Sequence, residues 1–267
     1  MQKLKSNKKK YTLSKLNVSY LKNNFLDNNE HYIVLKKFEK NNIFLKKKII
    51  TLASKLGNVL IQNKSGKKFI KVKPNINLIK KISHGKKLNK LRYHQTNTGG
   101  SIHSDGPQLK IPPKYVLMAC SKEATKGGYS IITNMKNIYI FLKKKKPNYL
   151  KILKKEFLFE RRGFNNRNAN VFSKPIFEVR KNFFRFRYLR EYIEAAYVLK
   201  KKNLKKSQVN ALNYLDKLIH NKSFQKKFKL NKGDMVILNN NILAHGRTGF
   251  PLNSNKQQRT ILRIWIK

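Results

Sequence analysis

The chain has 267 residues, of which 40% are hydrophobic, so it can bury one large core and fits a single domain. Its one cysteine, Cys120, excludes an internal disulfide and is expected to be a small buried residue of a strand. No apolar run approaches the ~18 residues of a membrane span, and no secretory signal follows the basic N-terminus. We therefore expect a cytoplasmic protein with no membrane partner.

The formal net charge of +50 comes from 62 basic and 12 acidic residues. Such a charge is typical of proteins that bind nucleic acid or anionic membranes. Here 51 of the basic residues are lysines that recur along the whole chain, which favours a solvated basic surface. The 11 arginines are more localised: seven lie between Arg161 and Arg190, and three are near the C-terminus. Arginine is needed where a planar, bidentate donor binds an anion. These groups of arginines therefore indicate either anion-binding sites or ordinary sheet surface.

The N-terminal third mixes polar segments with a few periodic ones. Residues 1–30 are rich in lysine and asparagine and are predicted to form a basic arm, with residues 31–267 as a single domain. A strand is expected within 31–38. The apolar residues of 41–57 recur at helical spacing and stop at Gly57, which predicts a helix. Residues 58–74 indicate two strands joined by a turn at Ser65 and Gly66.

Short β-like runs dominate the rest of the chain. Two helical segments, 134–155 and 205–220, interrupt them, and Ser207 is the expected N-cap of the second. This pattern predicts a mainly β (α+β) fold with two sheets, a barrel or jelly roll, and peripheral helices. The expected strands lie within residues 115–120, 129–133, 170–180, 182–189, 234–238 and 259–266.

Asp105 is the only acidic residue between Glu39 and Glu123, and it stands two places after His103. In a strand, residues i and i+2 point to the same face, so the two side chains would be able to bind one metal ion. The H-x-D pattern alone is weak. The other interpretation is a surface turn in which the Asp105 side chain bonds to its own backbone before Gly106.

The C-terminal residues offer the complement of that half-site. His245 follows a short apolar strand and is expected where the strand enters a loop, although a lone histidine is commonly a core residue. In the last strand Arg259, Arg263 and Trp265 share one face. If that face points inward, the two arginines need anionic partners, and since acids are scarce the partner is expected to be a ligand.

Two histidines and one carboxylate leave three open positions on an octahedral metal, the arrangement of non-haem Fe(II) oxygenases. An arginine fork nearby suits a dicarboxylate such as 2-oxoglutarate, because its carboxylate accepts two parallel charge-assisted hydrogen bonds. Each half of the pattern therefore predicts the other.

Four motifs in this order resemble the taurine dioxygenase and clavaminate synthase-like family of Fe(II)/2-oxoglutarate-dependent dioxygenases. They are HSD at 103–105, KGGYS at 126–130, HGRTGF at 245–250 and RTILRIW at 259–265. The resemblance covers roughly residues 56–267 and implies a double-stranded β-helix (jelly-roll) core. It also implies Fe(II) and 2-oxoglutarate, with His103, Asp105 and His245 as iron ligands.

The resemblance assigns the remaining roles position by position. Arg259 matches the arginine that holds the 2-oxoglutarate carboxylate, and Ser130 matches a threonine that donates to the same group. Arg263 matches a residue that contacts the substrate anion or supports the cosubstrate. An exposed edge-strand charge, or an ordinary strand residue for Ser130, is the alternative in each case.

The implied reaction consumes dioxygen, releases succinate and CO2 from 2-oxoglutarate, and hydroxylates or oxidatively cleaves a small organic substrate, with anions among the candidates. Two other hypotheses stay open. One is a basic nucleic-acid-binding protein on an oxygenase-like fold, and the other is an inactive relative that keeps the barrel.

Overall fold

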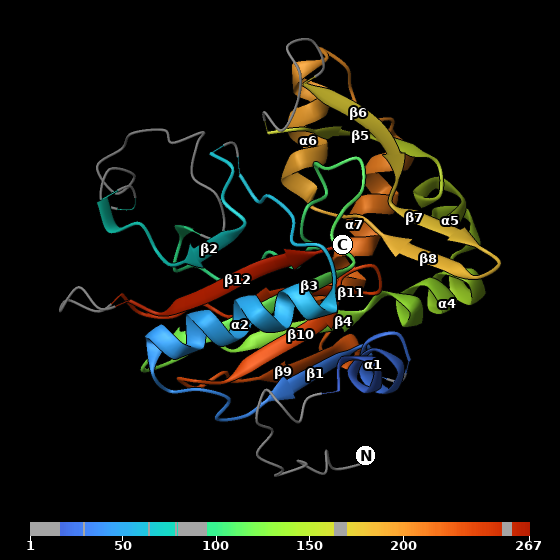
Figure 1. Cartoon of the computed structure of the whole chain (residues 1–267). Coiled ribbons are helices and arrows are strands. Elements are labelled where there is room, and N and C mark those ends of the chain that lie inside the picture. The colour runs from blue at the N-terminus through green and yellow to red at the C-terminus, as the bar shows by residue number, and fades with distance from the viewer. Residues whose placement is uncertain are drawn as a thin grey trace.

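Two antiparallel sheets form the centre of the fold (Figure 1). The computed structural model describes residues 17–28, 30–63, 65–77, 79, 95–162, 170–252 and 258–267. The larger sheet has the strand order β1-β10-β3-β12-β2, and the smaller has the order β11-β4-β9. The strands of the larger sheet are β1 (Tyr32–Leu35), β10 (Met235–Asn239), β3 (Tyr115–Lys122), β12 (Thr260–Ile266) and β2 (Phe69–Val72). Those of the smaller sheet are β11 (Leu243–Arg247), β4 (Ser130–Asn134) and β9 (Gln225–Phe228).

A hydrophobic layer joins the two sheets, because alternate residues of each strand point toward it. Val116 and Cys120 of β3 and Val236 of β10 belong to one buried cluster with Ile132 of β4 and Leu243 of β11. Cys120 is fully buried in this layer, which confirms its interpretation as a small strand hydrophobe.

The helix predicted over 41–57 is confirmed as α2 (Asn42–Leu56), which lies across the outer face of the larger sheet (Figure 1). The Asn41 side chain accepts hydrogen bonds from two first-turn N–H groups, the usual N-cap arrangement. The buried face of α2 joins one cluster with Leu262 and Ile264 of β12. At Gly57 a Cβ would lie 2.4 Å from the Lys267 carbonyl oxygen, so the close approach of the last residue requires glycine.

The segment 134–155, predicted as one helix, is two helices because Pro147 interrupts it. A proline lacks the N–H needed inside a helix and disfavours helical backbone at the residue before it, and Lys146 is accordingly non-helical. The helix predicted over 205–220 is confirmed, but its N-cap is Lys205 and not Ser207. The Gln208 side chain accepts from the Lys205 N–H at 3.0 Å. These helices are α4 (Met135–Lys145), α5 (Pro147–Leu153) and α7 (Lys206–His220).

The run 170–180, predicted as one strand, is divided between two hairpins. Ile176 leaves the strand, and its N–H donates to the Leu153 carbonyl at 3.1 Å. The hairpins pair β5 (Glu156–Glu160) with β6 (Val171–Pro175), and β7 (Phe177–Arg180) with β8 (Phe183–Phe186). The sequence did not predict β5, β9 or the helix α6 (Arg190–Leu199).

The two strands predicted within 58–74 are confirmed only in part. Residues 69–72 form β2, whereas Val59 makes a single bridge to Ile266. In the predicted arm, residues 1–16 lie outside the described residues. The short helices α1 (Val18–Leu21) and η2 (Lys22–Leu26) bury Leu21 and Leu26 beside α2, in the same cluster as its apolar face.

None of the helices in the described ranges combines the length and apolar character required to cross a membrane.

Candidate active site

The two histidines of the sequence motifs meet across one antiparallel bridge. The His103 N–H donates to the His245 carbonyl at 3.0 Å, and the His245 N–H donates to the His103 carbonyl at 2.8 Å. Their ring centroids are 5.0 Å apart. His245 lies inside β11, and not at the exit into a loop as predicted, while His103 belongs to no strand because its pairing ends after this bridge.

Asp105 completes a group of three side chains around one point. His103 Nε2 lies 3.8 Å from Asp105 Oδ1, and His245 Nε2 lies 3.6 Å from Asp105 Oδ2. The ligand atoms of all three residues lie within 4.8 Å of one another. Two atoms bound to one ion at ~2.1 Å are at most ~4.2 Å apart, so both histidine-to-aspartate separations suit a shared metal.

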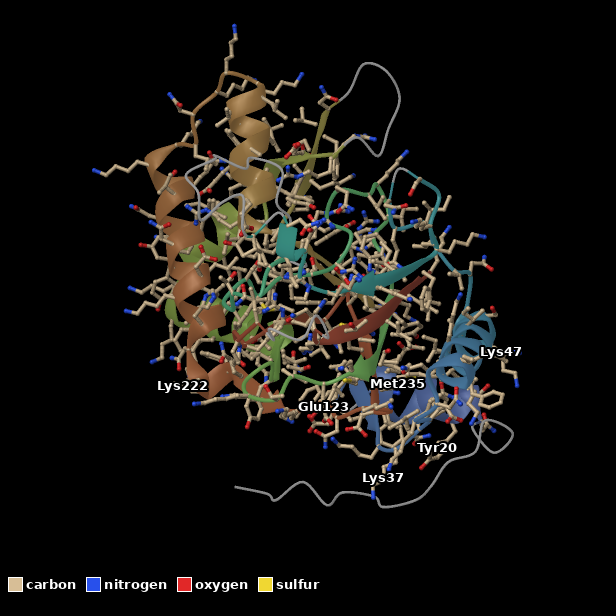
Figure 2. The ribbon with its side chains drawn as sticks, turned by 90° about the vertical axis from the view of Figure 1, so that its left-hand side faces the viewer. Tyr20, Lys37, Lys47, Glu123, Lys222 and Met235 are labelled. Atoms are coloured by element: carbon tan, nitrogen blue, oxygen red, sulfur yellow. The ribbon has the colours of Figure 1, made fainter. Side chains whose placement is uncertain are left out.

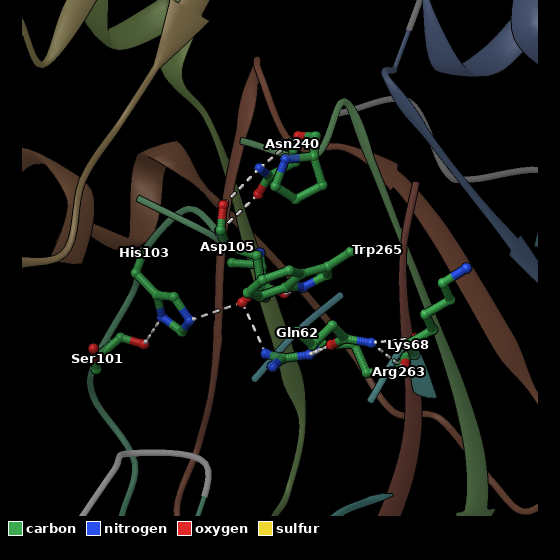
Figure 3. A network of polar contacts seen from close by, with 10 residues as sticks. Gln62, Lys68, Ser101, His103, Asp105, Asn240, Arg263 and Trp265 are labelled. Carbon is green, nitrogen blue, oxygen red and sulfur yellow. Dashed lines mark hydrogen bonds and ion pairs between the residues drawn. The ribbon is translucent and has the colours of Figure 1, made fainter. Parts of the chain in front are cut away.

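The Asp105 carboxylate is held on both oxygens by side chains of β12 (Figure 3). Arg263 Nη1 donates to Oδ1 at 2.8 Å, and Trp265 Nε1 donates to Oδ2 at 2.9 Å. The backbone is held as well, because the Asn240 side chain accepts from the Asp105 N–H at 2.7 Å and donates to its carbonyl at 3.0 Å. The orientation of Asp105 is therefore fixed by the chain itself.

The electrostatics of the site favour ionised Asp105 and neutral His245. Burial raises the pKa of Asp105, but the Arg263 charge and the neighbouring histidines outweigh burial and hold that pKa well below its usual range. Burial, aided by the charge of Arg263, lowers the pKa of His245 to about 3, although Asp105 acts in the opposite direction. A metal ion needs these two protonation states in its ligands.

The ring nitrogens also suit a metal. His103 Nδ1 lies 3.3 Å from the Ser101 carbonyl oxygen, which only accepts, so the tautomer with the proton on Nδ1 makes this hydrogen bond and leaves Nε2 available to a metal. Within the part of the chain that the structure describes, His245 Nδ1 is buried with no hydrogen-bond partner. Two imidazoles and one carboxylate form the donor set that ferrous iron takes in non-haem oxygenases.

A cavity of about 310 Å³ opens beside these three residues. Arg259, Ile261, Arg263 and Trp265 all line it, whereas Leu262 faces α2. The odd-numbered residues of the last strand share one face, as predicted, and that face points toward the cavity.

The structure places Arg259 and Ser130 on the wall of this cavity, both buried. Gly128, in the turn before β4, has φ 64° and a hypothetical Cβ only 3.0 Å from Arg259 Cδ. Glycine at this turn therefore leaves room for the arginine side chain. The family resemblance had implied that these two residues bind one carboxylate, and their roles stay a prediction.

Arg263 also lines the cavity, but the anionic partner that the sequence left to a ligand is Asp105 itself. Of the arginines between 161 and 190, Arg187 is the most deeply buried. Its guanidinium donates to the carbonyls of Pro107, Leu109 and Lys110, and so holds the loop that follows Asp105. Arg167 lies outside the described residues.

Sequence reasoning missed several residues that shape the site. Gln62 contacts Arg263, and Asn240 contacts Asp105, across more than 130 residues of chain. No local motif marks either residue. For Arg187 the clustering of arginines was a signal, but it did not indicate which member is buried.

Comparison with known proteins identifies the family. The family model for taurine catabolism dioxygenases, the TauD, TfdA family, matches residues 50–265. The chain is a member of the TauD, TfdA family. The matched range includes all three residues of the His-Asp-His group, and it also includes Arg259 and Arg263.

Among relatives of known function, this chain is similar to gamma-butyrobetaine dioxygenase from Homo sapiens and from Pongo abelii. Each match is 28% identical over 154 residues, covering 56% of this chain and 40% of the relative. The chain thus matches less than half the length of these relatives.

Two solved structures share the fold. Asparagine oxygenase in complex with Fe(II), 2S,3S-3-hydroxyasparagine and succinate has a TM-score of 0.71 at 13% identity, covering 93% of this chain and 77% of that one. The non-heme iron oxygenase OrfP in complex with Fe and alpha-ketoglutaric acid has a TM-score of 0.67 at 11% identity, covering 96% and 82%.

Proposed function

We propose that the chain is an Fe(II)- and 2-oxoglutarate-dependent dioxygenase that hydroxylates or oxidatively cleaves a small organic molecule. The single observation that carries this proposal is the convergence of His103, Asp105 and His245 at a cavity that also contains Arg259. We further propose that the two antiparallel sheets are the halves of a double-stranded β-helix. The likeness in fold to iron oxygenases supports that reading.

In this proposal His103, Asp105 and His245 would hold the iron and would leave coordination positions for other ligands. Arg259 binds the distal carboxylate of 2-oxoglutarate through two charge-assisted hydrogen bonds, and Ser130 donates to the same group. Ferrous iron supplies the redox chemistry by which dioxygen converts 2-oxoglutarate to succinate and CO2 and oxidises the substrate. The apolar cavity wall, which includes Ile261, limits the access of water.

The cavity volume of about 310 Å³ has to accept both the cosubstrate and the substrate, so the substrate is small. Related folds hold hydroxylated asparagine and hydroxylated arginine, and a relative acts as a gamma-butyrobetaine dioxygenase. We therefore propose a substrate of similar size that carries a charged group. Arg263 on the cavity wall is the residue proposed to contact an anionic group of it.

The test adds Fe(II) and 2-oxoglutarate anaerobically and measures the weak visible charge-transfer band of their chelate. The wild-type chain is expected to form the band, and His245→Ala to lose it because one of three protein ligands is gone. Arg259→Ala should form the band only at a higher 2-oxoglutarate concentration. A wild-type chain that never forms the band contradicts the proposal, and an unchanged 2-oxoglutarate requirement removes Arg259 from its assigned role.

A further inference from the structure

The carboxylate of Asp105 is oriented by two donors from one strand. Arg263 and Trp265 are two residues apart in β12, so their side chains lie on the same face and reach the two oxygens separately. Asp105 is 3% exposed, so the loss of either donor would leave a buried carboxylate oxygen without that hydrogen bond. The orientation of this carboxylate therefore depends on how firmly the Arg263 guanidinium is held.

Gln62 holds that guanidinium from the side opposite Asp105. Its Oε1 accepts from Arg263 Nε at 2.9 Å, in a contact that spans 201 residues of the chain (Figure 3). Gln62 is 2% exposed and lines the same cavity as the His-Asp-His group. Gln62 is thus connected to Asp105 through Arg263, although it is far from both residues in the sequence.

The amide of Gln62 has only one orientation that satisfies its neighbours. Its Nε2 donates to the carbonyls of Lys68 and Arg263, each at 2.9 Å. Because carbonyl oxygens only accept, the amide NH2 has to face them, and Oε1 then has to face Arg263 Nε. Gln62 therefore fixes the plane of the guanidinium as well as its position.

We propose that Gln62 and Arg263 are positioning residues for the metal-binding carboxylate. Gln62 holds the Arg263 guanidinium, and the guanidinium, together with the Trp265 indole, holds Asp105 in the orientation in which it faces His103 and His245. The inference rests on the proposed function, since it treats Asp105 as a metal ligand. It gives Arg263 a role that is exercised before any substrate arrives.

The effect of this pair should appear in metal affinity. Loss of a residue that hydrogen-bonds to a metal ligand weakens metal binding by roughly 10- to 100-fold. Gln62→Met keeps the length of the side chain but removes all three polar contacts. Arg263→Lys keeps the charge but has no Nε–H for Gln62 and no planar fork.

In the first measurement, Co(II) is titrated into the 267-residue chain with neither 2-oxoglutarate nor substrate present, and binding is monitored by the visible absorption of bound Co(II). Arg263→Lys is expected to weaken Co(II) binding by roughly 10- to 100-fold, and Gln62→Met, which acts through Arg263, by a smaller factor. The double variant should be little weaker than Arg263→Lys, because the two residues act in series. The matched control is Gln225→Met. It removes a hydrogen bond from the Gln225 side-chain amide to the Ile219 carbonyl, away from the cavity.

The second measurement needs no metal. Trp265 is the only tryptophan of the chain, so the protein has a single indole N–H resonance, which reports the bond to Asp105. Gln62→Met should shift this resonance in the metal-free chain, and Gln225→Met should leave it in place.

The outcomes separate the two proposals. A shifted indole resonance with no Co(II) binding by the wild-type chain contradicts the proposed function but retains the positioning of Asp105 by Gln62. Unchanged Co(II) affinity and an unshifted resonance in Gln62→Met overturn the inference. The same holds if Arg263→Lys leaves both Co(II) affinity and the indole resonance unchanged, which would remove Arg263 from the positioning of Asp105.

Discussion

Asp105 and His245 have, in the folded chain, the protonation states that a metal ion needs. The Arg263 charge keeps Asp105 ionised in spite of its burial, and burial keeps His245 neutral. A buried carboxylate without such a partner would instead become protonated. At the scale of single residues, a neighbouring charge and burial therefore set the protonation states of Asp105 and His245.

The lowered pKa of His245 predicts an acid-sensitive fold in the metal-free chain. Its folded pKa is about 3, below the ordinary histidine pKa of 6.5, so as pH falls below 6.5 the unfolded state gains a proton that the folded state does not bind. The free energy of unfolding should fall on this account by roughly 3 kcal/mol between pH 7 and pH 4. His245→Gln should lose that part of the pH dependence.

Urea unfolding of the wild type and of His245→Gln at pH 7 and pH 4, with a chelator present, measures the difference in the free energy of unfolding. Parallel pH profiles for the wild type and His245→Gln would contradict the prediction.

The last strand, β12, is the element that connects the core to the chemistry. One of its faces packs Leu262 and Ile264 beneath α2, while the other presents Arg263 and Trp265 to the cavity. Strand alternation alone predicts this division, because successive side chains point to opposite faces. The turn before β4 lies against the start of β12, where Gly128 approaches Arg259.

Gly128→Ala is expected to affect cosubstrate binding beyond its cost in stability. Gly128 has φ 64° and its Cβ would contact Arg259, whereas Gly66, with φ 73°, has open space around its Cβ position. Alanine at either position should lower the free energy of unfolding by about 1–2 kcal/mol, the cost of left-handed backbone. Only Gly128→Ala should raise the 2-oxoglutarate concentration needed for the charge-transfer band, by several-fold.

The comparison of Gly128→Ala with Gly66→Ala isolates the contact with Arg259. An equal 2-oxoglutarate requirement in the two variants would show that the turn does not position the arginine.

At the scale of the whole molecule, the positive charge is distributed over separate surfaces. Lys37, Lys47 and Lys222 are exposed at separate points of the periphery (Figure 2). The few acids are largely engaged in pairs, such as Asp234 with Lys36 and Asp27 with Lys114. The arrangement agrees with the expected solvated basic surface, and nucleic-acid binding stays an untested alternative.

A net charge of +50 should make the fold sensitive to ionic strength. Repulsion among like charges destabilises the compact state, and salt screens it, since the screening length falls from about 30 Å at 0.01 M to about 8 Å at 0.15 M. Raising sodium chloride over this range should increase the Tm by several degrees in a thermal scan. A Tm that is constant or falls would mean that local ion pairs outweigh the net repulsion.

The sequence by itself determined the features that depend on local order. The shared face of the last strand and the extent of α2 follow from periodicity and from the residue types at helix ends. The strand expected at His103 and Asp105 is absent, although the two side chains do converge. Local order also misled: Ser207 is inside α7, and Pro147 divides a predicted helix.

Only the tertiary structure decided which groups hold the site in place. Gln62 reaches Arg263 across 201 residues, and Trp265 reaches Asp105 across 160, so neither contact has a local signal. Such contacts depend on strand register and on the packing of segments that are far apart in the chain. For the same physical reason, the partner of Arg263 proved to be the acid of the first motif, which composition alone could not identify.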